Sequence, residues 1–216
     1  GPTASGKSEL SIQFATSENS EIISADAFQV YQEFTIGTGK LTLREQHGIP
    51  HHLIDFLHPE SEYTVQVFLN HVNSLIEQHP EKAFIICGGS AMYIKALLYG
   101  YTPLKRLPVK DRPEGSPQEL WDLLEKIDPE LANKTPHQNK LRVQRYLELY
   151  EIYKTPPTKL FQSKPMDTSK YDVIGISIEK KALKERINHR VNTMIQRGLV
   201  DEVEYLMKKY DNNSPA

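Results

Sequence analysis

The chain has very little cysteine and no long apolar run. Cys87 is the single cysteine among 216 residues, which excludes an internal disulfide and suits a reducing compartment. No stretch approaches the roughly 20 apolar residues of a membrane-spanning helix, and no segment resembles a signal peptide. These absences predict a cytoplasmic protein with no membrane partner.

The chain also lacks an excess of charge of either sign. Its 26 Lys and Arg residues nearly balance 28 Asp and Glu residues, for a formal net charge of −2. This balance excludes a protein that is basic over its whole surface, so any contact with a nucleic acid has to come from a local patch. The length predicts one sizeable core with a small appended subdomain.

The first eight residues form a phosphate-binding motif. They match G-x-x-x-x-G-K-[ST] at every fixed position, from Gly1 through Gly6 and Lys7 to Ser8. In such a loop successive backbone N–H groups converge on phosphate oxygens, and the next helix directs its N-terminus at them. Lys7 adds a positive charge, and the Ser8 hydroxyl is placed to ligate Mg²⁺. Because a P-loop follows a buried strand, we expect a strand before Gly1.

Short β-branched runs alternate with helical patterns, which predicts crossover units around a mostly parallel sheet. We expect strands over residues 21–24, 83–87 and 171–178, and helices after the phosphate loop, after residue 90 and after residue 178. The last helix carries an apolar stripe spaced four apart, Leu183, Ile187, Val191 and Ile195. The expected fold class is α/β, a P-loop NTPase-like three-layer parallel sheet flanked by helices.

A proline-rich stretch separates this pattern from a small helical subdomain. Its prolines mark residues 104–117 as a loop or linker. Two helices, over 119–127 and 139–153, follow outside the sheet pattern. We therefore divide the chain into a P-loop core, residues 1–103 and 165–216, and a helical segment, residues 104–164.

Two strand ends carry side chains that could act on a ligand. Asp26 follows the strand at 21–24, at the edge where open α/β sheets bind ligands. It could hold Mg²⁺, act as a general base or cap a turn. Ser90 follows Gly88-Gly89 and exposes a hydroxyl, although a serine there is more often a helix N-cap. The strand that ends at Cys87 offers no carboxylate, which a nucleotide triphosphatase would need.

Basic residues gather in two places. Arg186 and Arg190 lie four apart, so one helix face could present both to a diphosphate, or both could simply be solvated. A second group has tyrosines interleaved, as RNA binding requires, although a solvated helix face is equally compatible. Its members are Lys134, Lys140, Arg142, Arg145, Lys154, Lys159 and Lys164.

Taken in order, these motifs resemble the tRNA dimethylallyltransferase family over nearly the whole chain. Together they are much more specific than the P-loop alone. The segments that carry the resemblance are the opening octet, 21–26 with Gln29-Val30-Tyr31, Ile36-Gly37-Thr38, Pro50-His51-His52-Leu53-Ile54-Asp55, Gly88-Gly89-Ser90, 186–191 and 198–203.

The resemblance implies transfer of a dimethylallyl group from dimethylallyl diphosphate to N6 of adenine 37 in a tRNA anticodon stem-loop. It implies three catalytic residues: Asp26 as the general base, Ser90 beside the reacting centre in place of the family's usual threonine, and Lys7 neutralising the departing diphosphate. Mg²⁺ at Ser8 is the implied cofactor. The implied diphosphate-binding residues are Gly1, Thr3, Ala4, Ser5, Gly6, Lys7, Ser8, Arg186 and Arg190.

The resemblance also implies two groups of tRNA-binding residues in a protein that we expect to be monomeric. The first would hold a flipped-out adenine: Asp26, Ala27, Phe28, Gln29 and Ser90. The second resembles the family's other tRNA-contacting segment: Leu141, Arg142, Val143, Gln144 and Arg145. Departures from the family pattern at Gln138, Asn139 and Leu141 favour phosphate contacts over base-specific ones.

Three other functions stay open. Adenylate isopentenyltransferases resemble the same core but use a free nucleotide, and their usual lack of helices like those at 119–153 favours tRNA. An ATP-dependent small-molecule kinase would also use the P-loop, as would a nucleotide-sensing module without turnover.

Overall fold

The computed structural model describes residues 1–161 and 171–210. The chain divides into two compact units. One, called here the core unit, comprises Gly1–Tyr101 with Met166–Ala216, and the other, called the helical unit, comprises Thr102–Pro165.

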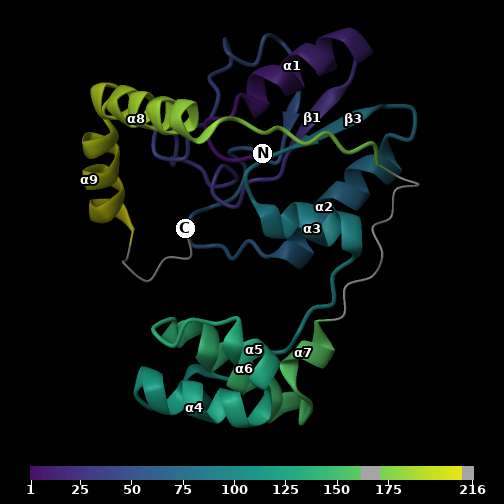
Figure 1. Ribbon diagram of the computed structural model, residues 1–216. Helices are drawn as coiled ribbons and strands as arrows, with labels where there is room; N and C mark the ends of the chain where they lie inside the picture. The colour runs from purple at the N-terminus through teal and green to yellow at the C-terminus, as the bar shows by residue number, and fades with distance from the viewer. Residues whose placement is uncertain (162–170, 211–216) are drawn as a thin grey trace. The chain divides into compact units, whose positions relative to one another are not determined.

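The core unit contains a parallel sheet in the strand order β2-β1-β3. β1 (Glu21–Ser24) and β3 (Phe84–Cys87) are strands that the apolar runs predict, and Ile23 of β1 pairs with Ile86 of β3. β2 (His51–His52) is too short for any periodic pattern to reveal it. Helices lie above and below the sheet (Figure 1). The predicted α/β, P-loop NTPase-like fold class is confirmed.

Three helices pack around this sheet. α1 (Lys7–Glu18) begins where the P-loop motif predicts and packs on β1 and β3. α2 (Val65–Gln78), which the sequence analysis did not find, and α3 (Ala91–Tyr99) pack together and share the main hydrophobic core with Ile23. Phe68 and Val72 of α2 are completely buried in that core. The sheet is therefore packed between helices.

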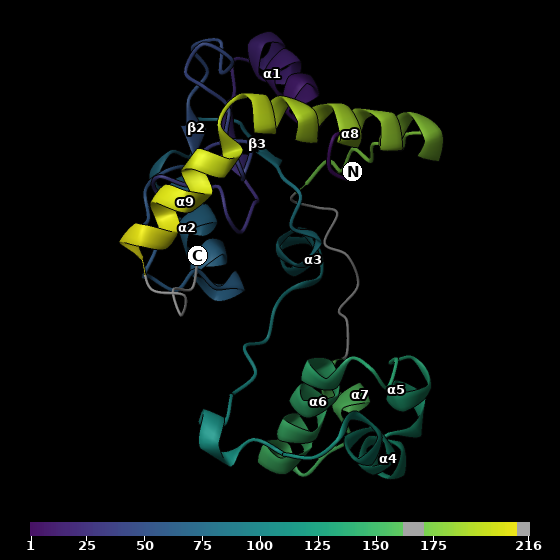
Figure 2. The same ribbon diagram turned by 90° about the vertical axis from the view of Figure 1, so that its left-hand side faces the viewer.

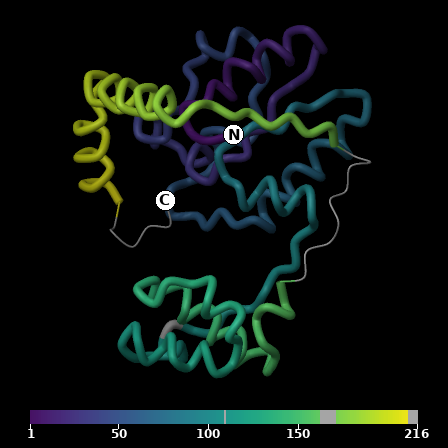
Figure 3. Tube along the Cα trace, in the orientation of Figure 1, coloured from purple at the N-terminus to yellow at the C-terminus, as the bar shows by residue number. Residues whose placement is uncertain are grey.

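The strand predicted over residues 171–178 is wrong. Residues 171–179 form an extended run without strand pairing in the described part of the chain (Figure 3). A strand exists only where a neighbour accepts its backbone hydrogen bonds, and here Val173 and Ile174 remain 53% and 63% exposed. The predicted helix does follow, as α8 (Lys180–Gln196), and α9 (Leu199–Lys209) comes after it.

The helical unit is built from α4 (Pro117–Ile127), α5 (Pro129–Asn133), α6 (Lys140–Tyr153) and α7 (Pro157–Leu160). Residues 104–116 contain no α-helix or strand and have one short 3₁₀ turn at Val109–Asp111, so the predicted linker ends one residue early, where α4 begins. Ser116 caps α4 through a capping box. Leu120, Leu124 and Val143 are completely buried and join α4 to α6.

None of the helices in the described ranges has the length and apolar content that a bilayer crossing requires.

Candidate active site

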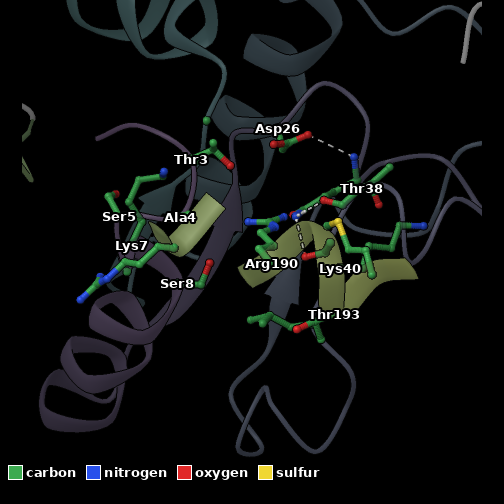
Figure 4. A pocket seen from close by; sticks show the side chains of 18 of the residues that line it. Thr3, Ala4, Ser5, Lys7, Ser8, Asp26, Thr38, Lys40, Arg190 and Thr193 are labelled. Carbon is green, nitrogen blue, oxygen red and sulfur yellow. Dashed lines mark hydrogen bonds between the residues drawn. The ribbon is translucent and has the colours of Figure 1, made fainter. Parts of the chain in front are cut away.

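A cavity of about 1350 Å³ opens at the end of the sheet in the core unit (Figure 4). Four parts of the chain line it. They are the phosphate loop with the start of α1, residues 26–45 in part, the end of β3 with residues 88–90, and one face of α8. Most residues of the predicted catalytic and diphosphate sets therefore lie around one space.

The phosphate loop has a backbone that presents N–H groups to this cavity. Ala4 and Gly6 both have positive φ, 56° and 87°, a conformation that suits anion-binding loops. No side chain in the described residues caps the N-terminus of α1, so its first N–H groups are free to bind an anion. Lys7 Nζ donates to the Pro2 carbonyl at 2.5 Å.

Burial lowers the pKa of Lys7. Neighbouring Cys87 and Asp26 act in the opposite direction, whereas the positive charge of Arg190 lowers the pKa of Lys7 as well. Lys7 and Arg190 line the same cavity. An anion between them would relieve their repulsion.

α8 passes the N-terminal end of α1 and brings both predicted arginines to the cavity (Figures 1 and 2). Nη1 of Arg186 lies 3.8 Å from the position that a Cβ at Gly6 would take. The guanidinium of Arg190 lies against Gly39, where an added Cβ would overlap it. Figure 4 shows Arg190 between Ser8 and Thr38. Lys7, Arg186 and Arg190 thus place three positively charged side chains around one cavity, which suits an anionic ligand.

Asp26 both caps a turn and faces the cavity. Its Oδ1 accepts the N–H groups of Phe28 at 2.9 Å and Gln29 at 3.3 Å. Its Oδ2 points to Gly89, 3.5 Å from the Cβ position there. One oxygen therefore fixes the carboxylate, and the other is directed to Gly89, which also lines the cavity.

The ends of β1 and β3 approach each other closely enough to require glycine. A Cβ at Gly88 would overlap the carbonyl of Ala25. Ser90 N–H donates to that same carbonyl at 3.1 Å. The contact brings Ser90 beside Asp26.

The expectation of a helix N-cap at Ser90 is confirmed for its position, but not for its side-chain contact. Ser90 is the N-cap residue of α3, but in the described structure its side chain does not cap that helix. Its Oγ instead accepts the N–H of Ala27 at 3.0 Å. Because Oγ is an acceptor in this contact, its own proton can be donated to a ligand in the cavity.

A model of the IPP transferase family matches residues 29–216. The tRNA dimethylallyltransferase of Macrococcus caseolyticus is 40% identical over 219 residues, which cover 97% of this chain and 70% of that protein. That of Halothermothrix orenii is 37% identical over 226 residues, covering 99% and 69%. The chain belongs to the IPP transferase family.

Solved structures agree with this assignment. A eukaryotic dimethylallyltransferase acting on tRNA superimposes with a TM-score of 0.77 at 31% identity, covering 99% of this chain and 56% of that one. The tRNA isopentenylpyrophosphate transferase of Bacillus halodurans gives a TM-score of 0.66 at 32% identity, covering 99% and 70%. This chain spans little more than half of the eukaryotic enzyme.

The three residues after Asp26 have different roles in this family member. Phe28 lines the cavity and is 56% exposed, so its ring is free to stack on a base. Ala27 packs against the hydrophobic core. The Gln29 amide is already engaged: Oε1 accepts from Ser24 Oγ at 3.2 Å, and Nε2 donates to the carbonyls of Thr38 and Gly39 at 3.2 and 3.3 Å.

In the helical unit, only part of the predicted RNA-contacting segment is accessible. Leu141 is 81% exposed, and Arg142 is also exposed. Val143 is completely buried, so its side chain cannot contact RNA. Gln144 donates to the Pro113 carbonyl at 2.9 Å, and Arg145 donates to two linker carbonyls at 2.8 and 3.1 Å. Lys164 of the basic group lies outside the described residues.

Sequence reasoning missed several residues that shape the cavity. Lys40, 5% exposed, lines it and pairs with Asp55 at 2.5 Å. Gly39 supports Arg190. Glu202 of α9 binds the loop that carries Gly39. Residues 36–38 and 198–203 were recognised as motifs, but nothing in their spacing shows that they meet in space.

Proposed function

We propose that this chain transfers a dimethylallyl group from dimethylallyl diphosphate to N6 of adenosine 37 in a tRNA anticodon stem-loop. One observation carries the proposal: a carboxylate and a hydroxyl, from Asp26 and Ser90, share a cavity with a P-loop and Arg190. Transfer of a prenyl group from its diphosphate to an amine needs a diphosphate-binding site next to a proton acceptor. The names of the relatives support the choice of substrates.

In the proposed reaction, the adenine N6 forms a bond with C1 of the prenyl group as the C1–O bond breaks. The diphosphate leaves with the electron pair of that bond, and the N6 proton passes to Asp26. Gln29 and Phe28 N–H groups hold the carboxylate through Oδ1, so Oδ2 is the oxygen that takes the proton. The Ser90 hydroxyl, which lies beside Asp26, would donate a hydrogen bond that orients the base.

The P-loop would bind the diphosphate of the prenyl donor. Backbone N–H groups of the loop, Lys7, Arg186 and Arg190 neutralise the charge that develops on the leaving group. Gly1, Thr3, Ala4 and Ser5 complete the loop, and its lining residues begin at Thr3. This use of the loop differs from nucleotide hydrolysis, for which an acidic Mg²⁺ ligand would be expected at the end of β3.

The residues present fit a Mg²⁺ ion bound through the substrate. Ser8 lines the cavity. The described residues contain no group of three or more His, Cys, Asp or Glu that could hold a metal by themselves. This composition suits an ion that takes most of its ligands from phosphate and water. Bound there by Ser8, Mg²⁺ would neutralise charge on the departing diphosphate.

Exposed basic residues of the helical unit, Arg142 and Lys140 among them, support a phosphate-backbone contact with the tRNA stem. Phe28 in the core unit is the aromatic side chain that would stack on the flipped adenine. A tRNA substrate also supports the expectation of a cytoplasmic protein. The expected monomer stays a prediction.

Mass spectrometry of an anticodon stem-loop tests the proposal. The RNA is incubated with the protein, Mg²⁺ and dimethylallyl diphosphate, and a matched RNA carries guanine at position 37. We expect the adenine RNA alone to gain the mass of one prenyl unit. Prenylation of free AMP with an untouched stem-loop would contradict the tRNA assignment, and phosphate transfer from ATP without prenyl diphosphate would indicate a kinase.

A further inference from the structure

The carboxylate of Glu202 binds three successive backbone N–H groups of one loop. Oε2 accepts from Thr35 at 3.1 Å and from Ile36 at 2.7 Å, and Oε1 accepts from Gly37 at 2.8 Å. Glu202 belongs to α9, more than 160 residues away along the chain. Hydrogen bonds to a charged acceptor are roughly twice as strong as neutral ones. This single side chain therefore fixes the backbone of residues 35–37.

α9 also holds the start of the same loop. Lys209 Nζ contacts both carboxylate oxygens of Glu33, at 2.7 and 2.8 Å, and Tyr210 Oη donates to Oε1 of Glu33 at 2.9 Å. Leu199 Cδ1 lies 3.2 Å from the position of a Cβ at Gly37. The helix thus contacts the loop at Glu33 and at residues 35–37, and of these Ile36 and Gly37 line the cavity.

The anchored segment continues directly into the support of Arg190. Gly39 N–H donates to the Ile36 carbonyl at 3.0 Å, so the position of Gly39 follows that of Ile36. Gln29 holds the Thr38 and Gly39 carbonyls from the opposite side. The Arg190 guanidinium lies on Gly39, which has φ of 64° and leaves no room for a Cβ.

We propose that Glu202 is a positioning residue for Arg190 at the diphosphate site. By holding residues 35–37 it fixes Gly39, and Gly39 fixes the Arg190 guanidinium, which lines the same cavity as Lys7. α8, which carries Arg190, joins α9 through Gly198, so the same contact also sets the place of α8. The inference rests on the proposed function only in taking the ligand of the P-loop to be a diphosphate.

The test is a double-mutant cycle on the binding of inorganic pyrophosphate with Mg²⁺, measured by calorimetry on the full chain. The variants are Glu202→Ala, Arg190→Ala and their combination. Losing one hydrogen bond to a charged group weakens binding about ten- to a hundredfold. We expect Arg190→Ala to fall in that range, Glu202→Ala to lose about tenfold, and the double variant to bind no worse than Arg190→Ala, because Glu202 acts through Arg190.

Glu204→Ala is the matched control, since Glu204 is an exposed glutamate on the same helix. It should bind pyrophosphate as the wild type does. Glu202→Gln keeps one side-chain carbonyl oxygen that can accept a hydrogen bond and should recover part of the loss. It also replaces Glu202→Ala in the cycle if the alanine variant does not fold by circular dichroism.

Three results would overturn the inference: wild-type affinity in Glu202→Ala, losses that add in the double variant, or no pyrophosphate binding by the wild type. None of these depends on prenyl transfer. If the wild type prenylates the stem-loop but the losses in the double-mutant cycle add, only the role of Glu202 is refuted. If the losses do not add but the wild type leaves the stem-loop unmodified, only the proposed function is refuted.

Discussion

Arg145 forms an ion pair with Glu148 inside the helical unit, with Nη1 2.8 Å from Oε2. The glutamate side chain is only 4% exposed, and it also accepts the N–H of Leu107. Burial alone would raise the pKa of Glu148, but the hydrogen bonds from Arg145 and Leu107 outweigh it and lower that pKa. Arg145 therefore joins the linker to α6. Its guanidinium is already paired and is not available to bind RNA.

Arg145→Ala should destabilise the protein by about 3–5 kcal/mol, because it leaves the Glu148 carboxylate buried without its partner. Urea unfolding measures this loss. The variant Arg145→Lys keeps the charge but not the forked contacts to the carbonyls of Leu104 and Lys105, so we expect an intermediate loss. Wild-type stability in Arg145→Ala would contradict the structural role.

Arg142→Ala should instead act on RNA binding. The Arg142 side chain is exposed, so stability should change by no more than about 0.5 kcal/mol. If it contacts phosphate, the variant should bind the stem-loop more weakly, with a salt slope lower by about 1. Filter binding at several salt concentrations measures both, and an unchanged affinity and slope would mean that this arginine is only solvated.

Asp26→Asn should lose about 100- to 10,000-fold of the prenylation rate, the range usual for a general base. Asparagine keeps an oxygen that can accept from Phe28 and Gln29, so the turn should survive while the proton acceptor is lost. Single-turnover prenylation gives the rate, and filter binding with the stem-loop should remain close to that of the wild type. Turnover at the wild-type rate would refute the assigned mechanism.

Gly39→Ala should weaken pyrophosphate binding about as much as Arg190→Ala, on the order of ten- to a hundredfold. The methyl group would occupy the place of the guanidinium. Gly48→Ala is the control, because Gly48 has a similar φ of 77° and nothing within 4 Å of its Cβ position. Equal affinities for the two variants would show that backbone strain, not the arginine, explains any loss.

Asp128 should give the helical unit a stability that disappears in acid. It accepts Leu131 N–H at 3.2 Å and the N–H and hydroxyl of Thr158 at 2.7 and 2.6 Å. Burial alone would raise the pKa of Asp128, but these hydrogen bonds lower it below the usual 3.8. A depressed pKa stabilises the fold above the unfolded value and loses that contribution as the pH falls through the folded value.

Asp128→Asn should therefore cost about 1–3 kcal/mol at neutral pH, and the difference from the wild type should shrink below about pH 4. Denaturant unfolding at several pH values measures this. Asp122→Asn, at an exposed position of α4, serves as the control. A difference that stayed constant down to strongly acidic pH would contradict the role of the Asp128 charge.

Local features of the chain could be predicted because their causes lie within a few residues. The phosphate loop is one example: its glycine spacing already requires the positive φ of Gly6, and α1 begins at Lys7 as expected. β1 and β3 follow from short apolar runs, and α4 and α6 from their helical pattern. Arg186 and Arg190 share a helix face simply because they lie four apart.

Residues 171–178 show a limit of predicting secondary structure from local sequence. Their apolar, β-branched composition is typical of a strand, but strand formation depends on a partner's backbone, which composition does not contain. Val143 shows the same limit for a helix: a motif placed it among RNA contacts, whereas packing against α4 buries it completely.

By itself, the sequence determined the phosphate loop, the parallel α/β core and the membership of a family whose motifs it carries in order. Only the tertiary structure decided what individual side chains bind. Ser90 meets Ala27, Glu202 meets Ile36, and Gln29 holds Gly39 because folding brings distant segments into contact. A hydrogen bond forms between groups that folding brings close together in space. The spacing of residues along the chain does not show which groups those are.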